Sequence, residues 1–110
     1  MNYLITGGAG FIGFNLANVL SDNPSNKIFI FDNLSKQSLD NDLKNILKRK
    51  NIKFIKGDLK NISKIIKLKS FDYIYHFAAI LGVKKVIQKP YSTLIENIIS
   101  TKEIIEYAKK

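Results

Sequence analysis

A chain of 110 residues, 45% of them hydrophobic, is long enough for one domain, and with no cysteine and one histidine it excludes disulfides and thiolate or histidine metal clusters, so we predict no metal. No apolar run approaches the roughly 18 residues that cross a bilayer and no signal-peptide pattern opens the chain, so we expect a cytoplasmic protein without a membrane segment. The formal net charge of +9 comes almost wholly from lysines spread along the chain, whereas nucleic-acid readers favour arginine and interleaved aromatics, so we predict no specific nucleic-acid partner.

The first predicted elements are a short buried strand over residues 3–5 and a helix from about residue 10 to residue 21. They are joined by the glycine-rich sequence TGGAGFIG, residues 6–13. A glycine-rich turn between a strand and a helix is typical of phosphate-binding loops, because the N-terminus of a helix attracts negative charge. The sequence therefore predicts a phosphate-binding turn here.

The glycines of this turn have separate expected roles. Gly7 and Gly8 are expected to adopt positive φ in a tight turn. Gly10 is expected to let the backbone approach a pyrophosphate, since a Cβ there would hold the ligand away from the amide donors. Gly13 is expected to let the helix pack close against the strand.

The second strand is predicted over residues 27–31 and ends at Asp32, which lies 19 residues beyond Gly13. At this spacing a carboxylate at the tip of the second strand accepts hydrogen bonds from an adenosine ribose. A 2′-phosphate would be repelled there, which favours NAD over NADP, although Lys36 could soften that preference. The alternative for Asp32 is an Asx turn with Asn33.

Strand and helix patterns continue to alternate along the rest of the chain. We predict a helix over about residues 39–48, an edge strand over 52–56, a third helix capped by Asn61 or Ser63 and running through 68, a strand over 71–79, a short helix or loop over 82–88, and the longest helix over 91–110, after Pro90. Together these elements predict an α/β fold, a truncated, Rossmann-type doubly wound parallel sheet with strand order 3-2-1-4.

Several residues near the predicted strand ends allow two interpretations. His76 is expected to be a packed, hydrogen-bonded histidine rather than an acid or base. Ala78 and Ala79 leave room either for a cofactor or for a closely packed helix. From its local sequence alone, Asp58 is expected to be a turn residue. Asn97 lies beside an apolar stripe and needs a partner, either backbone or a ligand.

These motifs together resemble the N-terminal half of the extended short-chain dehydrogenase/reductases. Within that group the chain looks most like the NAD-dependent epimerase/dehydratase family acting on nucleotide sugars, such as UDP-glucose 4-epimerases. The residues that carry the resemblance are TGGAGFIG at 6–13, Asp32-Asn33-Leu34-Ser35, Gly57-Asp58-Leu59, His76-Phe77-Ala78-Ala79, Gly82-Val83, Pro90 and Asn97.

The resemblance implies that residues 1–110 are an NAD-binding Rossmann domain. It places Phe11 and Ile12 against the pyrophosphate and Asp32 on the adenosine ribose, with Asn33 and Ser35 in the same pocket. Asp58 and Leu59 would contact adenine, Phe77, Ala78 and Ala79 would follow the ribose and pyrophosphate, and Asn97 would support the cofactor or the active site. The expected cofactor-binding residues are thus Gly7, Gly10, Phe11, Ile12, Gly13, Asp32, Asn33, Ser35, Asp58, Leu59, Phe77, Ala78, Ala79 and Asn97.

The family reaction is a transient oxidation at the sugar C4 by hydride transfer to NAD, and its base is the tyrosine of a YxxxK motif. No tyrosine here is followed four residues later by lysine. We therefore expect no catalytic residue in this chain and no turnover of a sugar by this chain alone. A nucleotide sugar is the expected partner once a C-terminal part completes the enzyme. The alternatives are a non-catalytic dinucleotide-binding module or a subunit of a split enzyme, and the helix over 91–110 is a possible interface for a homodimer or a partner chain.

Overall fold

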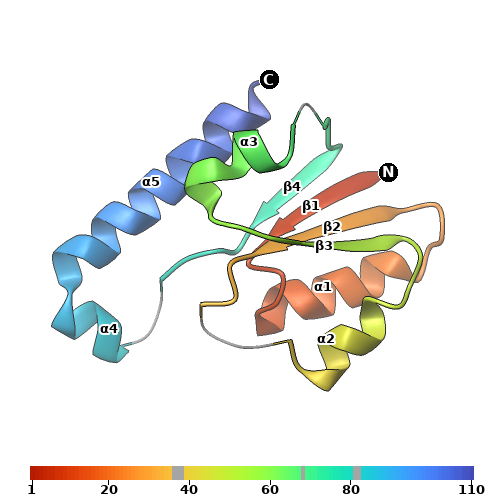
Figure 1. Ribbon diagram of the computed structural model, residues 1–110, viewed down its shortest axis with the longest axis horizontal. Coiled ribbons are helices and arrows are strands. Elements are labelled where there is room, and N and C mark those ends of the chain that lie inside the picture. The colour runs from red at the N-terminus through yellow and green to blue at the C-terminus, as the bar shows by residue number, and fades with distance from the viewer. Residues whose placement is uncertain (36–38, 68, 81–82) are drawn as a thin grey trace.

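The computed structural model describes residues 1–35, 39–67, 69–80 and 83–110. At its centre is a four-stranded sheet in which every neighbouring pair is parallel, in the order β3-β2-β1-β4 (Figure 1). The strands are β1 (Asn2–Thr6), β2 (Lys27–Asp32), β3 (Ile52–Lys56) and β4 (Tyr73–His76). The predicted α/β class and the strand order 3-2-1-4 are therefore confirmed.

Helices cover both faces of this sheet (Figure 1). One face is covered by α1 (Phe11–Ser21) and α2 (Asn41–Ile46), and the other by the 3-10 helix η1 (Leu59–Asn61), α3 (Ile62–Ile65) and α5 (Pro90–Ala108). The short helix α4 (Val83–Gln88) contacts α5. Each face of the sheet thus has its own hydrophobic core.

The residues of β2 show why both faces are covered. Ile28 and Ile30 belong to the core shared with α1 and α2, whereas Phe29 and Phe31 belong to the core shared with α3 and α5. All four side chains are at most 7% exposed. An unbroken apolar run is the pattern of a parallel strand buried between two layers of helices.

The two edges of the sheet differ. β3 is the edge strand that the sequence predicts, and it exposes Lys53 and Lys56, which discourage pairing with other chains. Within the part of the chain that the structure describes, β4 pairs with β1 alone, so its outer edge is open. Tyr73, at the start of this strand, is 48% exposed.

Two elements are shorter than the sequence predicts. The strand predicted over residues 71–79 ends at His76, because its partner β1 ends at Thr6, whose carbonyl accepts the last hydrogen bond from the Phe77 amide at 3.0 Å. The helix predicted over 39–48 is α2, which begins after Asp40. The side chain of Asp40 caps it by accepting a hydrogen bond from the amide of Leu43.

The structure places Asn61, one of the two predicted caps of the third helix, at the N-cap position of α3. Asp58 accepts a hydrogen bond from the Lys60 amide and begins η1, whereas Asn61, at the start of α3, makes no capping bond with its side chain. The aspartate that the sequence left as a turn residue is therefore the side-chain cap of η1, the 3-10 helix that leads into α3. The predicted end of this helix at residue 68, the effect of Lys36 and the match at Gly82 lie outside the described residues.

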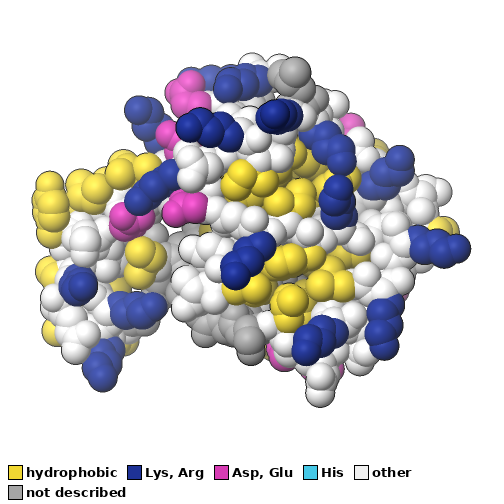
Figure 2. All heavy atoms as spheres, viewed as in Figure 1, with side chains coloured by type: hydrophobic (Ala, Val, Ile, Leu, Met, Phe, Trp, Pro, Cys, Tyr) yellow, Lys and Arg dark blue, Asp and Glu magenta, His cyan; other side chains and the backbone are white. Residues whose placement is uncertain are grey.

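The chain carries a formal net charge of +9, and its basic side chains are spread over the face that Figure 2 shows. On the face in Figure 2, lysine and arginine side chains are scattered over most elements, and hydrophobic side chains show both on the left, over the start of α5, and in the middle of the view. Tyr91 is 76% exposed and Leu94 is 58% exposed. None of the helices in the described ranges is long and apolar enough to cross a membrane.

Candidate functional site

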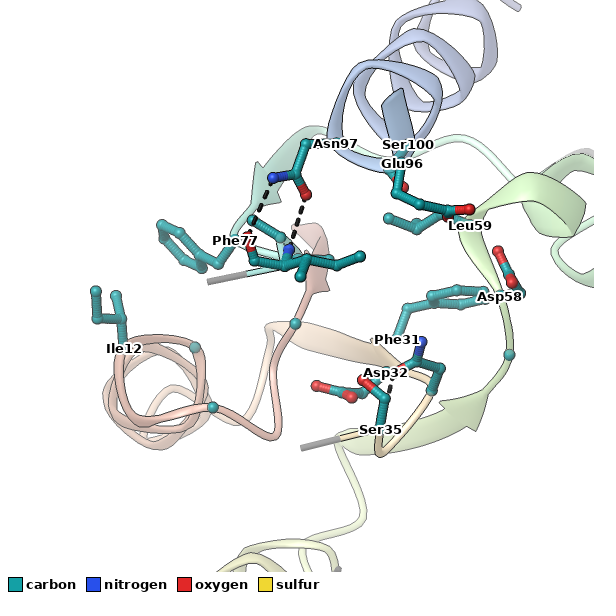
Figure 3. A pocket seen from close by; sticks show the side chains of 18 of the residues that line it. Ile12, Phe31, Asp32, Ser35, Asp58, Leu59, Phe77, Glu96, Asn97 and Ser100 are labelled. Atoms are coloured by element: carbon teal, nitrogen blue, oxygen red, sulfur yellow. Dashed lines mark hydrogen bonds between the residues drawn. The ribbon is translucent and has the colours of Figure 1, made fainter. Parts of the chain in front are cut away.

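A cavity of about 450 Å³ opens where the four strands end. Its lining comes from the glycine turn after β1, the ends of β2, β3 and β4, and the middle of α5. In Figure 3, Ile12 lies at one end of this cavity and Asp58 and Leu59 lie at the other. Every residue that the sequence predicts for the cofactor lines it, and their contacts with a cofactor stay predictions.

The glycine turn is packed too tightly for side chains. Gly7 has φ of +68°, and a Cβ there would lie 2.7 Å from the backbone nitrogen of Ala78. The prediction of positive φ is confirmed for Gly7 and wrong for Gly8, which is glycine for a different reason. A Cβ on Gly8 would lie 2.6 Å from Cγ2 of Ile30. The turn thus lies directly on the ends of β2 and β4.

The N-terminus of α1 faces the cavity without a side-chain cap. Gly10 is the N-cap residue, and it has no side chain to occupy the amides of the first turn, which have no acceptor within the helix. A Cβ on Gly13 would lie 2.6 Å from the Cα of Gly8, so Gly13 lets the helix pack against the glycine turn. The sequence alone predicts instead that Gly13 packs the helix against the strand. Phe11 is 85% exposed and Ile12 is 64% exposed at the rim.

Asp32 joins the second strand to this turn. Its Oδ2 accepts a hydrogen bond from the Ala9 amide at 3.0 Å, and its Oδ1 accepts one from the Leu34 amide at 2.8 Å. The Asx-turn alternative is therefore present as well, with the amide of Leu34 rather than that of Asn33 as the donor. Because a carboxylate has about four acceptor sites, Asp32 retains capacity for ligand hydroxyls.

The loop after Asp32 is held in an unusual conformation. Leu34 has φ of 58°, in the left-handed region that residues with a side chain rarely adopt. The side chain of Asn33 accepts a hydrogen bond from the Ser35 amide at 2.9 Å, so two successive Asx turns form this loop. They place Asn33 and Ser35 on the lining of the cavity.

An ion pair lies at the end of the cavity that Asp58 and Leu59 line. Nζ of Lys60, in η1, lies 2.9 Å from Oε1 of Glu96, in α5, and this hydrogen bond raises the pKa of Lys60. Glu96 itself lines the cavity next to Asp58 and Leu59 (Figure 3). The pair ties η1 to α5.

Sequence reasoning missed some lining residues. Glu96 and Ser100 lie next to Asn97 or three residues beyond it on one helix, so helical periodicity around Asn97 could have found them. Phe31 and Gly57 immediately precede predicted site residues, and Ile80 follows the predicted pair of alanines. The lining residues that were not predicted are Phe31, Gly57, Ile80, Glu96 and Ser100.

Asn97 finds its partner in the backbone. Its Oδ1 accepts from the Ile80 amide at 2.7 Å, and its Nδ2 donates to the Ile80 carbonyl at 3.1 Å (Figure 3). It therefore pins the segment after β4 to α5.

His76 is packed and hydrogen-bonded, as predicted, between Thr6 and Thr101, and burial lowers its pKa.

The charged side chains on the described lining are all acidic, namely Asp32, Asp58 and Glu96. No group of three or more metal-ligating side chains that could hold an ion occurs within the described ranges. A phosphate in this cavity would therefore be bound by backbone amides and by the N-terminus of α1, not by lysine or arginine. The arrangement suits a ligand with hydroxyls near Asp32 and a phosphate near Gly10.

A parallel sheet in the order 3-2-1-4, with a glycine turn opening the first helix and a carboxylate at the tip of the second strand, defines a Rossmann-type domain. The sequence profile of the GDP-mannose 4,6 dehydratase family matches residues 4–110. The chain belongs to that family.

Known proteins are similar to this chain over nearly its whole length. The chain is 36% identical over 110 residues to dTDP-D-glucose 4,6-dehydratase of Dictyostelium discoideum, a match that covers 96% of this chain and 25% of that protein. Among solved structures, it resembles the UDP-Glc/GlcNAc 4-epimerase of Campylobacter jejuni with a TM-score of 0.80 at 32% identity, over 96% of this chain and 32% of that one. It also resembles dTDP-glucose 4,6-dehydratase of Bacillus anthracis in complex with NAD, with a TM-score of 0.75 at 35% identity, over 99% of this chain and 33% of that one.

These comparisons confirm the resemblance to nucleotide-sugar epimerases and dehydratases. The chain spans about a quarter to a third of the length of these proteins.

Proposed function

We propose that this chain binds NAD as the cofactor-binding domain of a nucleotide-sugar epimerase or dehydratase. The observation that carries the proposal is the juxtaposition of the uncapped α1 N-terminus and the Asp32 carboxylate on one cavity, linked by the Ala9 amide. An NAD-bound dehydratase of the same fold supports the choice of cofactor.

The residues of the cavity fit the parts of NAD. The amides of the first turn of α1 would bind the diphosphate, because the N-cap residue Gly10 has no side chain that could stand between these amides and the ligand. Asp32 would accept hydrogen bonds from the adenosine ribose, and Asp58 with Leu59 would face the base at the other end of the cavity (Figure 3). When bound, NAD supplies a hydride acceptor for the sugar.

We expect the cofactor to bind without turnover by this chain alone. The general base of the resembled family is the tyrosine of YxxxK, and no tyrosine up to Tyr91 is followed by lysine at that spacing; for Tyr107 the position lies beyond residue 110. A nucleotide sugar is therefore proposed as substrate only of the completed enzyme. The exposed apolar side chains of α5 and the open edge of β4 support the second candidate, a subunit that pairs with another copy or with a separate catalytic chain.

Calorimetric titration with NAD tests the proposal. We expect saturable binding by the wild-type chain and binding at least about tenfold weaker in Gly10→Ala, whose added methyl group would separate the diphosphate from the amides. The control is Val19→Ala, an exposed change at the far end of the same helix and off the lining of the cavity, which should bind as the wild type does. Absence of binding in a folded wild-type chain contradicts the proposal.

A second measurement addresses turnover. The chain is incubated with NAD and UDP- or dTDP-glucose, and NADH absorbance and sugar products are followed. We expect neither to change. Conversion of the sugar by the purified chain would contradict the proposed division between cofactor binding and catalysis.

A further inference from the structure

His76 is the single histidine of the chain, and it lies behind the cavity rather than on its lining. Its ring is half-buried between β1 and α5. The Nδ1 atom lies 2.7 Å from Oγ1 of Thr6, and the Nε2 atom lies 3.4 Å from Oγ1 of Thr101. One imidazole thus connects the ends of two strands to a helix.

The two threonine hydroxyls determine which ring nitrogen carries the proton. Thr101 donates its only hydroxyl proton to the carbonyl of Asn97 at 2.9 Å, so its oxygen can only accept from His76. Thr6 already accepts from the Ala78 amide at 3.4 Å, and it is fully buried, so its own proton needs an acceptor. An unprotonated Nδ1 at 2.7 Å is that acceptor.

The opposite tautomer does not satisfy these groups. A proton on Nδ1 would point at Thr6 and leave the Thr6 hydroxyl proton without its acceptor. An unprotonated Nε2 would compete with the carbonyl of Asn97 for the single proton of Thr101. Leaving a buried donor unpaired costs more than a satisfied hydrogen bond contributes, so the network selects the Nε2–H form.

We propose that neutral His76, in the Nε2–H form, is a positioning residue that fixes the glycine turn against the wall segment, residues 77–80, of the cavity. Thr6 immediately precedes Gly7, and His76 immediately precedes the wall segment. A Cβ on Gly7 would lie 2.7 Å from the nitrogen of Ala78, so the two backbones are in close contact. The hydrogen-bonded group Thr6–His76–Thr101, called the relay below, holds them at this point.

The far end of the relay reaches the same wall segment by a second route. Thr101 is bonded to the backbone of Asn97, and Asn97 is bonded to both backbone groups of Ile80. Ala78 and Ile80, which line the cavity, are therefore tied to one network from both sides. Its effect on cofactor affinity rests on the proposed function, whereas its effect on the backbone does not.

Nitrogen-15 NMR of the imidazole tests the tautomer directly, because the chain has a single histidine and needs no assignment. Long-range proton–nitrogen spectra are recorded on the folded chain without NAD at pH 7.5. We expect Nε2 to show the shift of a protonated nitrogen and Nδ1 that of an unprotonated one. An Nδ1–H form, or an equal mixture of both, overturns the proposal.

A matched pair of variants at Thr101 tests the positioning role. Thr101→Val removes the hydroxyl at an exposed site, and Thr101→Ser retains it. In Thr101→Val the hydroxyl's hydrogen bonds to His76 and to the Asn97 carbonyl are both lost, so we expect amide hydrogen exchange of Ala78 and Ile80 to accelerate at least about three- to tenfold, while the amide of Ile28 in β2 is unchanged. Thr101→Ser should exchange as the wild type does.

The affinity for NAD is measured on the same variants and should fall about three- to tenfold in Thr101→Val only. Unchanged exchange of Ala78 and Ile80 in Thr101→Val overturns the positioning role. A wild-type chain that binds no NAD contradicts the proposed function instead, and the exchange rates and the tautomer still decide whether His76 holds the wall segment.

Discussion

The carboxylate of Asp32 accepts a hydrogen bond from the amide of Ala9 at 3.0 Å, and this contact joins the tip of β2 to the glycine turn. The same side chain also accepts from the amide of Leu34 at 2.8 Å. A residue that the sequence singles out for a ligand is therefore also part of the framework that shapes the ligand site. Removing it should affect folding before any ligand is added.

We expect Asp32→Ala to lower the free energy of unfolding by about 1–3 kcal/mol, because two part-buried amides lose their acceptor. Urea denaturation of the chain without NAD measures this change. The matched control is Asp42→Ala, an exposed carboxylate in the first turn of α2, which should cost about 0.5 kcal/mol or less. Equal effects of the two variants would show that the contact with Ala9 does not stabilise the fold.

The acidic lining of the cavity should determine which dinucleotide binds. Asp32, Asp58 and Glu96 supply its charged side chains, and no lysine or arginine of the described residues lies on the lining. A 2′-phosphate near Asp32 would meet a like charge, so we expect NADP to bind at least about tenfold more weakly than NAD. Parallel calorimetric titrations check this, and equal affinities would place the ribose away from Asp32.

The close contact of α1 with the glycine turn gives a prediction with the opposite sign from helix propensity. Alanine is a better helix former than glycine by about 1 kcal/mol, so Gly13→Ala would stabilise a free helix. Here the new Cβ would lie 2.6 Å from the Cα of Gly8 and 2.8 Å from the carbonyl oxygen of Gly7, and backbone atoms cannot move aside easily.

We therefore expect Gly13→Ala to destabilise the chain by about 1–3 kcal/mol in urea denaturation. Val19→Ala, an exposed change on the same helix, should stay within about 0.5 kcal/mol of the wild type. If Gly13→Ala were the more stable of the two, the turn and helix would be further apart than the structure shows.

The strand order, the site at the strand ends and most elements could be predicted because they depend on local apolar runs and on glycine spacing. The reason for each glycine could not. Gly7 adopts positive φ, whereas Gly8 avoids the side chain of Ile30, which is 22 residues away in sequence. Sequence spacing shows that glycine is needed, but the contact that needs it is tertiary.

The end of β4 shows the same limit. Residues 71–79 are mostly apolar and favour a longer strand, but a strand continues only while its neighbour does, and β1 stops at Thr6. The chain then turns so that Asn97 binds the backbone of Ile80. That bond also answers the question the sequence left open about Asn97, since both atoms of its amide group pair with backbone.

Burial of His76 gives a pH dependence whose sign can be worked out. Its pKa in the folded chain is lowered below the unfolded value near 6.5, so the unfolded state takes up the proton first as the pH falls. The stability that the neutral ring contributes is complete above about pH 6.5 and is lost as the pH falls from there towards the folded pKa.

Urea denaturation from pH 8 to pH 5 measures this loss. The matched comparison is His76→Gln, which keeps a polar side chain but does not titrate in this window. We expect the stability of the wild type to fall relative to that of the variant between about pH 6.5 and pH 5. Parallel curves for the two proteins would show that His76 titrates normally in the folded chain.

Arg49, the single arginine of the chain, fastens the segment before β3 to the end of α1. Its Nη1 donates to the carbonyl of Asn18 at 3.0 Å and to the hydroxyl of Ser21, and it lies 3.0 Å from the carboxylate of Asp22. Asp22 is 71% exposed, so the ion pair should contribute little in water. The bonds to α1 should matter more.

We expect Arg49→Lys to lower the free energy of unfolding by about 1 kcal/mol, because lysine keeps the charge but its ammonium ends one bond short of Nη1, the single nitrogen that contacts all three acceptors. Asp22→Asn should cost less than about 0.5 kcal/mol. Urea denaturation at low and high salt separates the two contributions, since only the ion pair is screened. A larger loss for Asp22→Asn, removed by salt, would make the ion pair rather than the helix contacts responsible for holding β3 in place.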